Sequence, residues 1–152
     1  KMKFIKILLI LCFTLFYSKL VLAEENGTRE QAEQLLERSI AIFNIDKNRA
    51  LDLFTTGNGG TIVNDLYIFC FAPDYTITAH PKVIGLNIYE NGPKDLDGNN
   101  LAERMANEAK QGVTSEVQYK LRKYNTESEE EFMKTTLYTK IQDQVCGVGY
   151  YN

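Results

Sequence analysis

Few side chains in this chain could carry out catalysis or bind a metal ion. His80 is the single histidine, and its imidazole could donate a hydrogen bond to a carboxylate or another polar group. The chain has no Gly-x-Ser-x-Gly motif and no cysteine–histidine pairing, which excludes the usual forms of nucleophilic catalysis. A zinc site would need CxxC spacing or a second histidine. We therefore expect a non-enzymatic protein without a metal ion or cofactor.

The segment from Asp95 to Asn99 alternates oxygen-bearing side chains, as calcium loops do. An EF-hand loop needs glycine at its sixth position and glutamate at its twelfth. Here Gly98 is fourth and Ala106 is twelfth. We expect a polar turn that precedes a helix.

Other residues could form the wall of a binding pocket. Tyr67 and Phe69 lie two positions apart in an apolar run, so both point to one face of a strand. Tyr67 and Tyr138 each offer an apolar ring and a hydroxyl, which suits either a pocket or an ordinary core. A bound carboxylate would need a cation near it. The basic residues near these elements are Arg104, Lys134 and Lys140, of which the two lysines lie on the wetter phase of their strand.

We take six residues as candidates for ligand binding: His80, Tyr67, Phe69, Arg104, Tyr138 and Pro81, which directly follows His80.

The start of the chain has the layout of a signal peptide. Lys3 and Lys6 precede an apolar run from Ile7 to Tyr17, which is shorter than the roughly 20 residues of a membrane span. We expect residues 1–23 to be a signal peptide and residues 24–152 to be one exported domain, periplasmic or secreted. An uncleaved anchor that tethers the domain to a membrane is the alternative.

Charge and cysteine use describe the remaining domain. Without residues 1–23 the chain keeps 13 of its 17 basic residues against 20 acidic ones, so an interaction with nucleic acid is not expected. Cys70 and Cys146 lie in apolar, strand-like stretches, and an exported protein is free to form disulfides. A disulfide between them is one interpretation. We favour the other, two separate buried thiols.

Periodicity predicts three helices. Thr28 and Gln31 form a capping-box pattern, and an apolar stripe follows at helical spacing, made of Ala32, Leu35, Leu36, Ile40 and Phe43. A second, short helix is expected from Lys47 to Phe54, before the glycines of residues 57–60. A third is expected from Asn100 to Gln111.

The remaining segments predict strands. Leu66 to Phe71 is a continuous apolar run, typical of a strand buried on both faces, and turn residues join it to a strand over residues 76–80. Residues 113–122 alternate between apolar and polar side chains, and residues 133–141 and 145–151 give two further strands. The order is α-α-β-β-α-β-β-β. It predicts an α+β fold with a five-stranded antiparallel sheet and a helical crossover.

Several of these segments, in order and spacing, resemble the single Cache domain family. They are DLYIFCFAPD at residues 65–74, TAHP at 78–81, IGLN at 84–87, KDLDGN at 94–99, EAKQG at 108–112, Tyr138 and CGVGYY at 146–151. The resemblance spans residues 30–152. It implies a PAS-like or profilin-like sheet behind a long N-terminal helix.

The resemblance also implies a function. Members of this family are extracytoplasmic ligand sensors of chemotaxis receptors, histidine kinases and cyclic-nucleotide enzymes, and they often bind small carboxylates or other polar metabolites. On this basis His80 is expected to contact the ligand. Many members carry an aromatic residue after the glycine that ends the middle helix, whereas Val113 and Thr114 follow Gly112 here. The identity of the ligand therefore does not carry over.

Two functions remain open. The first is an exported module that binds a small organic ligand and, since the sequence ends after the last strand, passes the signal to a separate membrane receptor. Its N-terminal helix would contact that receptor or a second copy. The alternative is a structural or protein-interaction protein that keeps the fold without a ligand. An exposed apolar patch on the first helix would favour this alternative.

Overall fold

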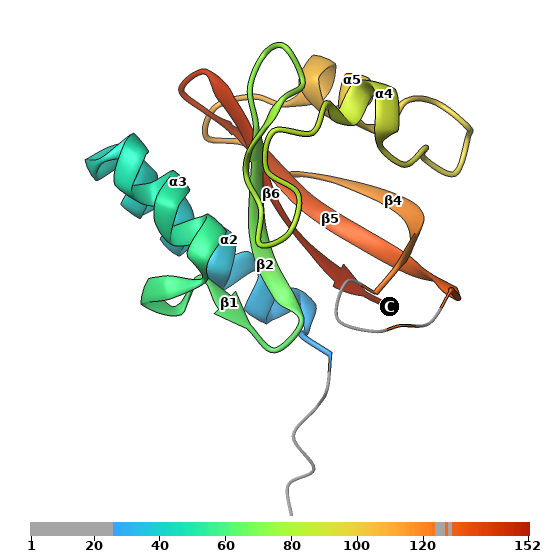
Figure 1. The fold of residues 1–152 in the computed structure, drawn as a ribbon, viewed down its shortest axis with the longest axis horizontal. Coiled ribbons are helices and arrows are strands. Elements are labelled where there is room, and N and C mark those ends of the chain that lie inside the picture. The colour runs from blue at the N-terminus through green and yellow to red at the C-terminus, as the bar shows by residue number, and fades with distance from the viewer. Residues whose placement is uncertain (1–25, 124–126, 128) are drawn as a thin grey trace, which may run out of the picture.

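The computed structural model describes residues 26–123, 127 and 129–152. The expected signal peptide, residues 1–23, lies outside the described residues. One antiparallel sheet forms the centre, with two helices against one face and two shorter helices and a long loop against the other (Figure 1).

The sheet has six strands in the spatial order β1-β2-β6-β5-β4, and β3 also pairs with β2. Their bounds are β1 Ile62–Val63, β2 Leu66–Phe71, β3 Ile77–Ala79, β4 Ser115–Arg122, β5 Glu131–Ile141 and β6 Gln144–Tyr151. The five expected strands and the α+β class are confirmed. The sixth strand, β1, has two residues, too few to show a period in the sequence.

The long helix α2 (Arg29–Ile45) begins with the expected capping box, in which Thr28 and Gln31 exchange side-chain and backbone hydrogen bonds. Helix α3 (Lys47–Thr56) follows, and Gly57 ends it in the left-handed conformation with φ 75°. A short 3-10 turn, η1 (Asn58–Gly60), comes next.

Two shorter helices lie over the other face of the sheet. One turn of helix within the long loop is α4 (Ile88–Asn91), and α5 (Leu101–Glu108) is capped by Asn100. Helix α5 ends before the predicted Gln111 because Ala109 is already extended, at φ −62° and ψ 128°.

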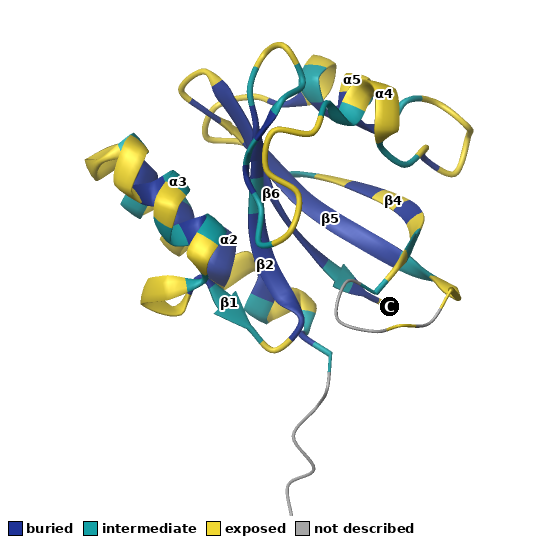
Figure 2. Cartoon of the chain, in the orientation of Figure 1, coloured by how far each residue is buried: buried dark blue, intermediate teal, exposed yellow. Residues whose placement is uncertain are grey.

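The sheet separates two hydrophobic clusters. The first packs α2 and α3 against β2, β5 and β6, and includes Leu35, Phe43, Phe54, Ile68, Leu137 and Val148. The second lies on the opposite face under α5 and includes Phe71, Leu101, Met105, Val117, Tyr119 and Tyr138. Figure 2 shows β2, β5 and β6 buried along most of their length. No helix in the described ranges is long and apolar enough to cross a membrane.

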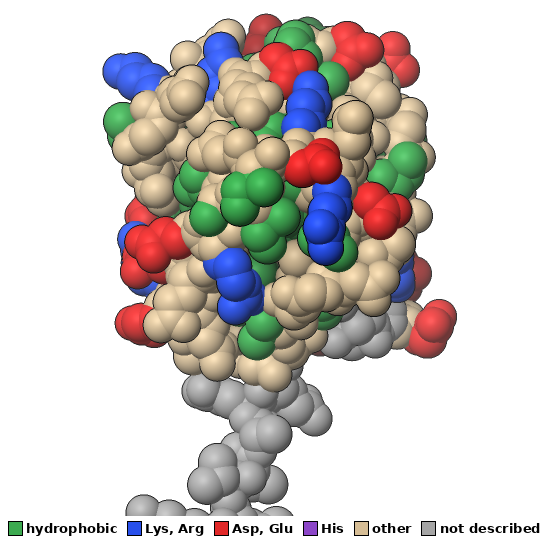
Figure 3. All heavy atoms as spheres, turned by 90° about the vertical axis from the view of Figure 1, so that its left-hand side faces the viewer, with side chains coloured by type: hydrophobic (Ala, Val, Ile, Leu, Met, Phe, Trp, Pro, Cys, Tyr) green, Lys and Arg blue, Asp and Glu red, His purple; other side chains and the backbone are tan. Residues whose placement is uncertain are grey.

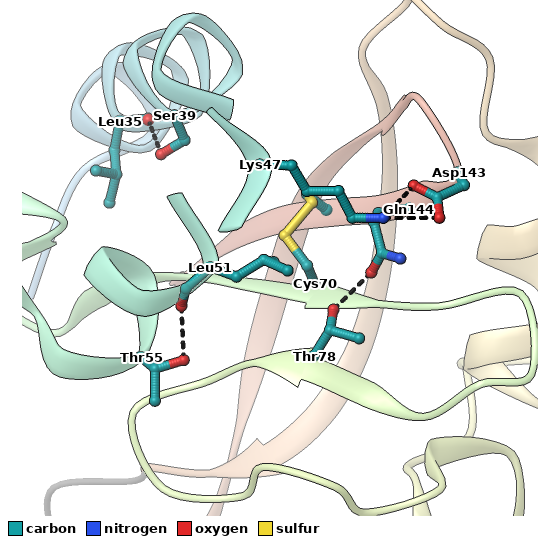
Figure 4. The surroundings of a disulfide bond; sticks show 10 residues. Leu35, Ser39, Lys47, Leu51, Thr55, Cys70, Thr78, Asp143 and Gln144 are labelled. Carbon is teal, nitrogen blue, oxygen red and sulfur yellow. Dashed lines mark hydrogen bonds and ion pairs between the residues drawn. A yellow bond between two sulfur atoms is a disulfide. The ribbon is translucent and has the colours of Figure 1, made fainter. Parts of the chain in front are cut away.

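Cys70 and Cys146 form a disulfide within the first cluster. The two residues stand directly opposite each other where β2 pairs with β6, and their Cα atoms are 4.1 Å apart. Figure 4 shows the bond close to the Thr78–Gln144 hydrogen bond and the Lys47–Asp143 ion pair. The favoured interpretation of two separate thiols is wrong, because the pairing register of two strands distant in sequence sets their distance.

The apolar stripe of α2 faces the sheet. Its residues Ala32, Leu35, Leu36 and Phe43 are at most 1% exposed, whereas Ile45 at the end of the helix is 86% exposed. The outer surface of the helical layer carries Lys, Arg, Asp and Glu side chains with apolar side chains between them (Figure 3). The stripe is therefore part of the protein's own core. Contact of the N-terminal helix with a receptor or a second copy stays a prediction.

Candidate ligand-binding site

A cavity of about 170 Å³ lies on the face of the sheet opposite α2 and α3. Its walls come from β2, β3, β4, α5 and the loop that contains α4. The lining residues are Tyr67, Phe69, Ile77, His80, Val83, Leu86, Ile88, Asn91, Gly92, Pro93, Leu101, Ala102, Met105, Tyr119 and Leu121. Three of the six candidate residues, His80, Tyr67 and Phe69, are among them.

Strand geometry brings Tyr67 and His80 together. Tyr67 and Phe69 point to the same face of β2, as their spacing predicts, and His80 follows the last residue of β3, which pairs with β2. The rings of Tyr67 and His80 meet edge to face with their centroids 4.8 Å apart. This pair forms one wall of the cavity.

The hydrogen bonds of His80 fix its tautomer. Its Nδ1 accepts from the backbone N–H groups of Lys82, at 2.9 Å, and Val83, at 3.3 Å, so the ring proton of the neutral form is on Nε2. Burial, together with the positive charges of Lys134 and Lys82, lowers the pKa of His80 to about 4. At neutral pH, His80 is an uncharged donor.

Lys134 places a buried positive charge beside this wall. Its side chain is 2% exposed, and its ammonium donates to the hydroxyl of Tyr67 at 3.2 Å. The same nitrogen lies 4.7 Å from the ring centroids of both Tyr67 and Tyr151, so cation–π attraction replaces part of its hydration. Burial lowers the pKa of Lys134 to about 8, an effect that the charge of Asp65 partly offsets. The ammonium form is therefore the major one at neutral pH.

The strand pattern placed Lys134 and Lys140 on the wetter phase of β5. For Lys140 this prediction is confirmed, since it is exposed. For Lys134 it is wrong, because the rings of Tyr67 and Tyr151 cover its side chain.

Gly149 makes room for Lys134. Strand β6 lies between β5 and β2, so the lysine side chain has to cross it to reach Tyr67. A Cβ atom at position 149 would lie 2.4 Å from Cε of Lys134 and 2.7 Å from Oγ1 of Thr136. In the Cys-Gly-Val-Gly-Tyr-Tyr segment of β6, Gly149 thus stands at the position where the side chain of Lys134 crosses the strand.

Asp65, Lys134, Tyr67 and His80 form a row of polar residues, called the polar line below. Asp65 lies at the end of this row that is away from the cavity. It has the same strand phase as Tyr67 and is 1% exposed. Its Oδ1 accepts from the N–H of Gly27, just before α2, and its Oδ2 has no hydrogen-bond partner within the described part of the chain. Polar groups therefore extend from the start of α2, through Asp65, Lys134 and Tyr67, to His80 at the cavity.

Three candidate residues do not line the cavity. Arg104 points away from it and donates to Asp95 at 2.8 Å and to Glu108 at 3.1 Å. The hydrogen bond from Arg104 is the main reason why the pKa of Asp95 falls to about 2. Tyr138 is buried under α5 and donates to Glu108 at 2.9 Å. Pro81 follows His80 but is outside the lining.

The polar segment at residues 95–99 is a turn, as expected. Oδ1 of Asp95 accepts from the backbone N–H groups of Asp97 and Asn99 at 3.0 and 2.8 Å. Among the residues that the structure describes, no group of three or more His, Cys, Asp and Glu side chains is placed to hold a metal ion.

Sequence reasoning missed much of the apolar lining. Leu101 and Met105 belong to the predicted stripe of α5, and Tyr119 and Leu121 to the apolar phase of β4. These patterns show that a side chain faces inward. Whether it meets another side chain or an open space depends on the path of the long loop.

No protein-family model and no curated protein sequence matches this chain. Among solved structures, a methyl-accepting chemotaxis protein from Vibrio parahaemolyticus aligns with a TM-score of 0.61 and 17% identity, over 81% of this chain and 87% of that chain. A periplasmic sensor domain of a chemotaxis protein aligns with a TM-score of 0.55 and 20% identity, over 80% and 88%. A Cache chemosensory domain aligns with a TM-score of 0.53 and 19% identity, over 80% and 86%.

The fold is that of a Cache chemosensory domain. The antiparallel sheet, the long N-terminal helix and the helical crossover over the opposite face confirm the architecture expected from the sequence.

Proposed function

We propose that this protein is an extracytoplasmic sensing module that binds a small carboxylate in the cavity between β2 and α5. Residues 1–23 would be its signal peptide and residues 24–152 the exported domain. The observation that carries the proposal is the buried ammonium of Lys134, which lies one side chain away from the cavity, behind Tyr67.

Electrostatics favour an anion in this place. A buried ammonium is costly, as the lowered pKa of Lys134 reflects, and a nearby negative charge reduces that cost. His80 offers an N–H donor to the cavity, and no other partner for this Nε2–H is found among the described residues. A carboxylate that accepts from His80 would use this donor, with Lys134, behind Tyr67, supplying the balancing charge.

The comparisons add support of a general kind. The structural neighbours are sensor domains of chemotaxis proteins, and one was described for its recognition of carboxylic acids. A membrane receptor that receives the signal is part of this proposal. The contact of Asp65 with Gly27 offers a route, because it connects the polar line beside the cavity with the start of α2.

The alternative, an interaction protein without a ligand, has less support. An exposed apolar patch on the first helix would favour it. The stripe of α2 is buried, and an open cavity lies beside Tyr67 and His80.

A thermal-shift screen of the purified protein tests the proposal. Acetate, propanoate, lactate and hexanoate would be compared with the matching primary amides at equal concentration. We expect a saturable rise in melting temperature with at least one acid and none with its amide, because ligands that bind only the native state stabilise it. His80→Gln should reduce the rise. An equal response to acids and amides, or none to any acid, would contradict a carboxylate site.

A further inference from the structure

We infer that the ligand is a monocarboxylate with a compact apolar body, and that dicarboxylates, hydroxy acids and amino acids are poor ligands. The inference rests on the proposed carboxylate site and specifies its ligand class. It is drawn from the unequal distribution of polar groups around the cavity.

His80 and Tyr67 lie together in one part of the cavity. None of the lining residues carries a formal charge at neutral pH. Besides His80 and Tyr67, two lining side chains have polar atoms. The hydroxyl of Tyr119 is bonded to that of Thr136 at 2.9 Å, and Nδ2 of Asn91, an exposed residue, donates to the backbone oxygen of Asn87 at 3.1 Å. A second carboxylate, or the ammonium group of an amino acid, would lose its hydration without gaining a partner.

The rest of the lining is largely apolar. Leu101 and Met105 of α5, Leu121 of β4 and Ile88 of α4 belong to it. The volume of about 170 Å³ is close to that of an engineered cavity of about 150 Å³ that binds benzene. An apolar body of about that size would fill the space and leave the head group beside His80 and Tyr67.

The rim of the cavity supports the same ligand class. Val83 and Leu86 line the cavity and are each 38% exposed, and their neighbour Ile84 is 52% exposed. These exposed large apolar side chains occupy one short segment of the loop, around Gly85 with its φ of 77°. An apolar ligand body would cover Val83 and Leu86, and removal of that surface from water favours binding.

Calorimetric titration of the purified protein with propanoate, hexanoate, benzoate, adipate and lactate tests the inference. Adipate matches hexanoate in chain length and adds a second carboxylate. Each buried methylene should contribute about fourfold, so hexanoate, with three more methylenes, should bind about 60-fold more tightly than propanoate. Adipate should bind at least about tenfold more weakly than hexanoate, because its second charge meets no partner.

Variants locate the apolar body. Ala102→Leu fills the cavity and should weaken hexanoate and benzoate about tenfold, with propanoate changed less than about twofold. Asn107→Leu, on the exposed side of the same helix, is the matched control and should change none of them. Leu121→Asn, at a partly exposed position, gives a second test should Ala102→Leu fail to fold, and it should selectively weaken the acids with apolar bodies.

Each contrary outcome is distinct. Binding of lactate or adipate as tight as that of hexanoate, or an affinity for hexanoate that neither cavity variant changes, would overturn the inference and leave the carboxylate site intact. Absence of binding by every acid in the series would overturn both.

Discussion

The ammonium of Lys134 donates to the hydroxyl of Tyr67 at 3.2 Å, and this contact joins β5 to β2 across the intervening strand β6. It places a cation immediately behind the wall of an otherwise uncharged cavity. Because Tyr67 also touches His80, the charge, the hydroxyl and the imidazole form one polar cluster. The proposed function depends on this arrangement.

Removal of the cation tests its role in binding. Lys134→Met should weaken binding of hexanoate by about 2 kcal/mol, roughly 30-fold. The variant loses the positive charge that balances the carboxylate and the hydrogen bond to the hydroxyl of Tyr67. Calorimetric titration measures the change. Lys140→Met is the matched control, since Lys140 has the same phase on β5 but is exposed, and it should bind like wild type. Equal weakening in both variants would point to a general charge effect.

The imidazole of His80 makes stability depend on pH. Its pKa is about 4 in the folded protein, against an ordinary value of 6.5, so below pH 6.5 the unfolded chain binds a proton that the folded protein does not. The stabilising contribution of neutral His80 is therefore complete above pH 6.5, is lost as the pH falls toward 4, and amounts to about 3 kcal/mol.

Urea unfolding between pH 4 and 7 measures this effect. His80→Gln lacks the titrating group, so its unfolding free energy should fall less than that of wild type as the pH is lowered from 7 to 4. The carboxyl groups contribute equally to the pH dependence of both proteins. Parallel profiles of wild type and His80→Gln would show that His80 has its ordinary pKa when folded.

Gly149 is expected to be essential for the position of Lys134. Gly149→Ala brings a methyl group to 2.4 Å from Cε of Lys134, which is held between two rings, and should destabilise the protein by about 1–3 kcal/mol. The double variant with Lys134→Ala should recover part of that loss, because Cε of Lys134 is gone while Oγ1 of Thr136 remains. Thermal or urea unfolding of the four proteins of the cycle gives the coupling energy, and additive effects would contradict the contact.

The disulfide should stabilise the domain. It joins residues 76 positions apart in the chain, and a loop of that length corresponds to about 4 kcal/mol of chain entropy. Cys70→Ala together with Cys146→Ala should lower the unfolding free energy by about that amount, plus a small cost for lost packing. The double variant should also be insensitive to reductant. A reductant-independent stability of wild type would show that the bond does not form.

The fold could be largely predicted because its elements have strong local signals. The capping box of Thr28 and Gln31, the run from Leu66 to Phe71 and the alternation in residues 113–122 each specify an element without reference to distant residues. The strand β1 lacks such a signal, and its pairing with β2 depends on the turn between them.

The site was predictable only in part. Tyr67, Phe69 and His80 lie on the β2–β3 hairpin, and local spacing was sufficient to bring them together. Arg104 and Tyr138 are oriented by Glu108, whose partners are known only once α5 is packed on the sheet. Lys134 is buried because Gly149, distant along the chain, leaves space for it, and no local pattern carries that information.

Nuclear magnetic resonance titration of His80 tests the central claim most directly. The chain has one histidine, so the imidazole signals of a ¹⁵N-labelled sample need no assignment. The pKa of about 4 in the free protein should rise by about one to two units with saturating hexanoate, because a nearby carboxylate favours the charged imidazole. A pKa that stays at its ligand-free value while hexanoate is bound would place the carboxylate elsewhere and contradict the proposed site.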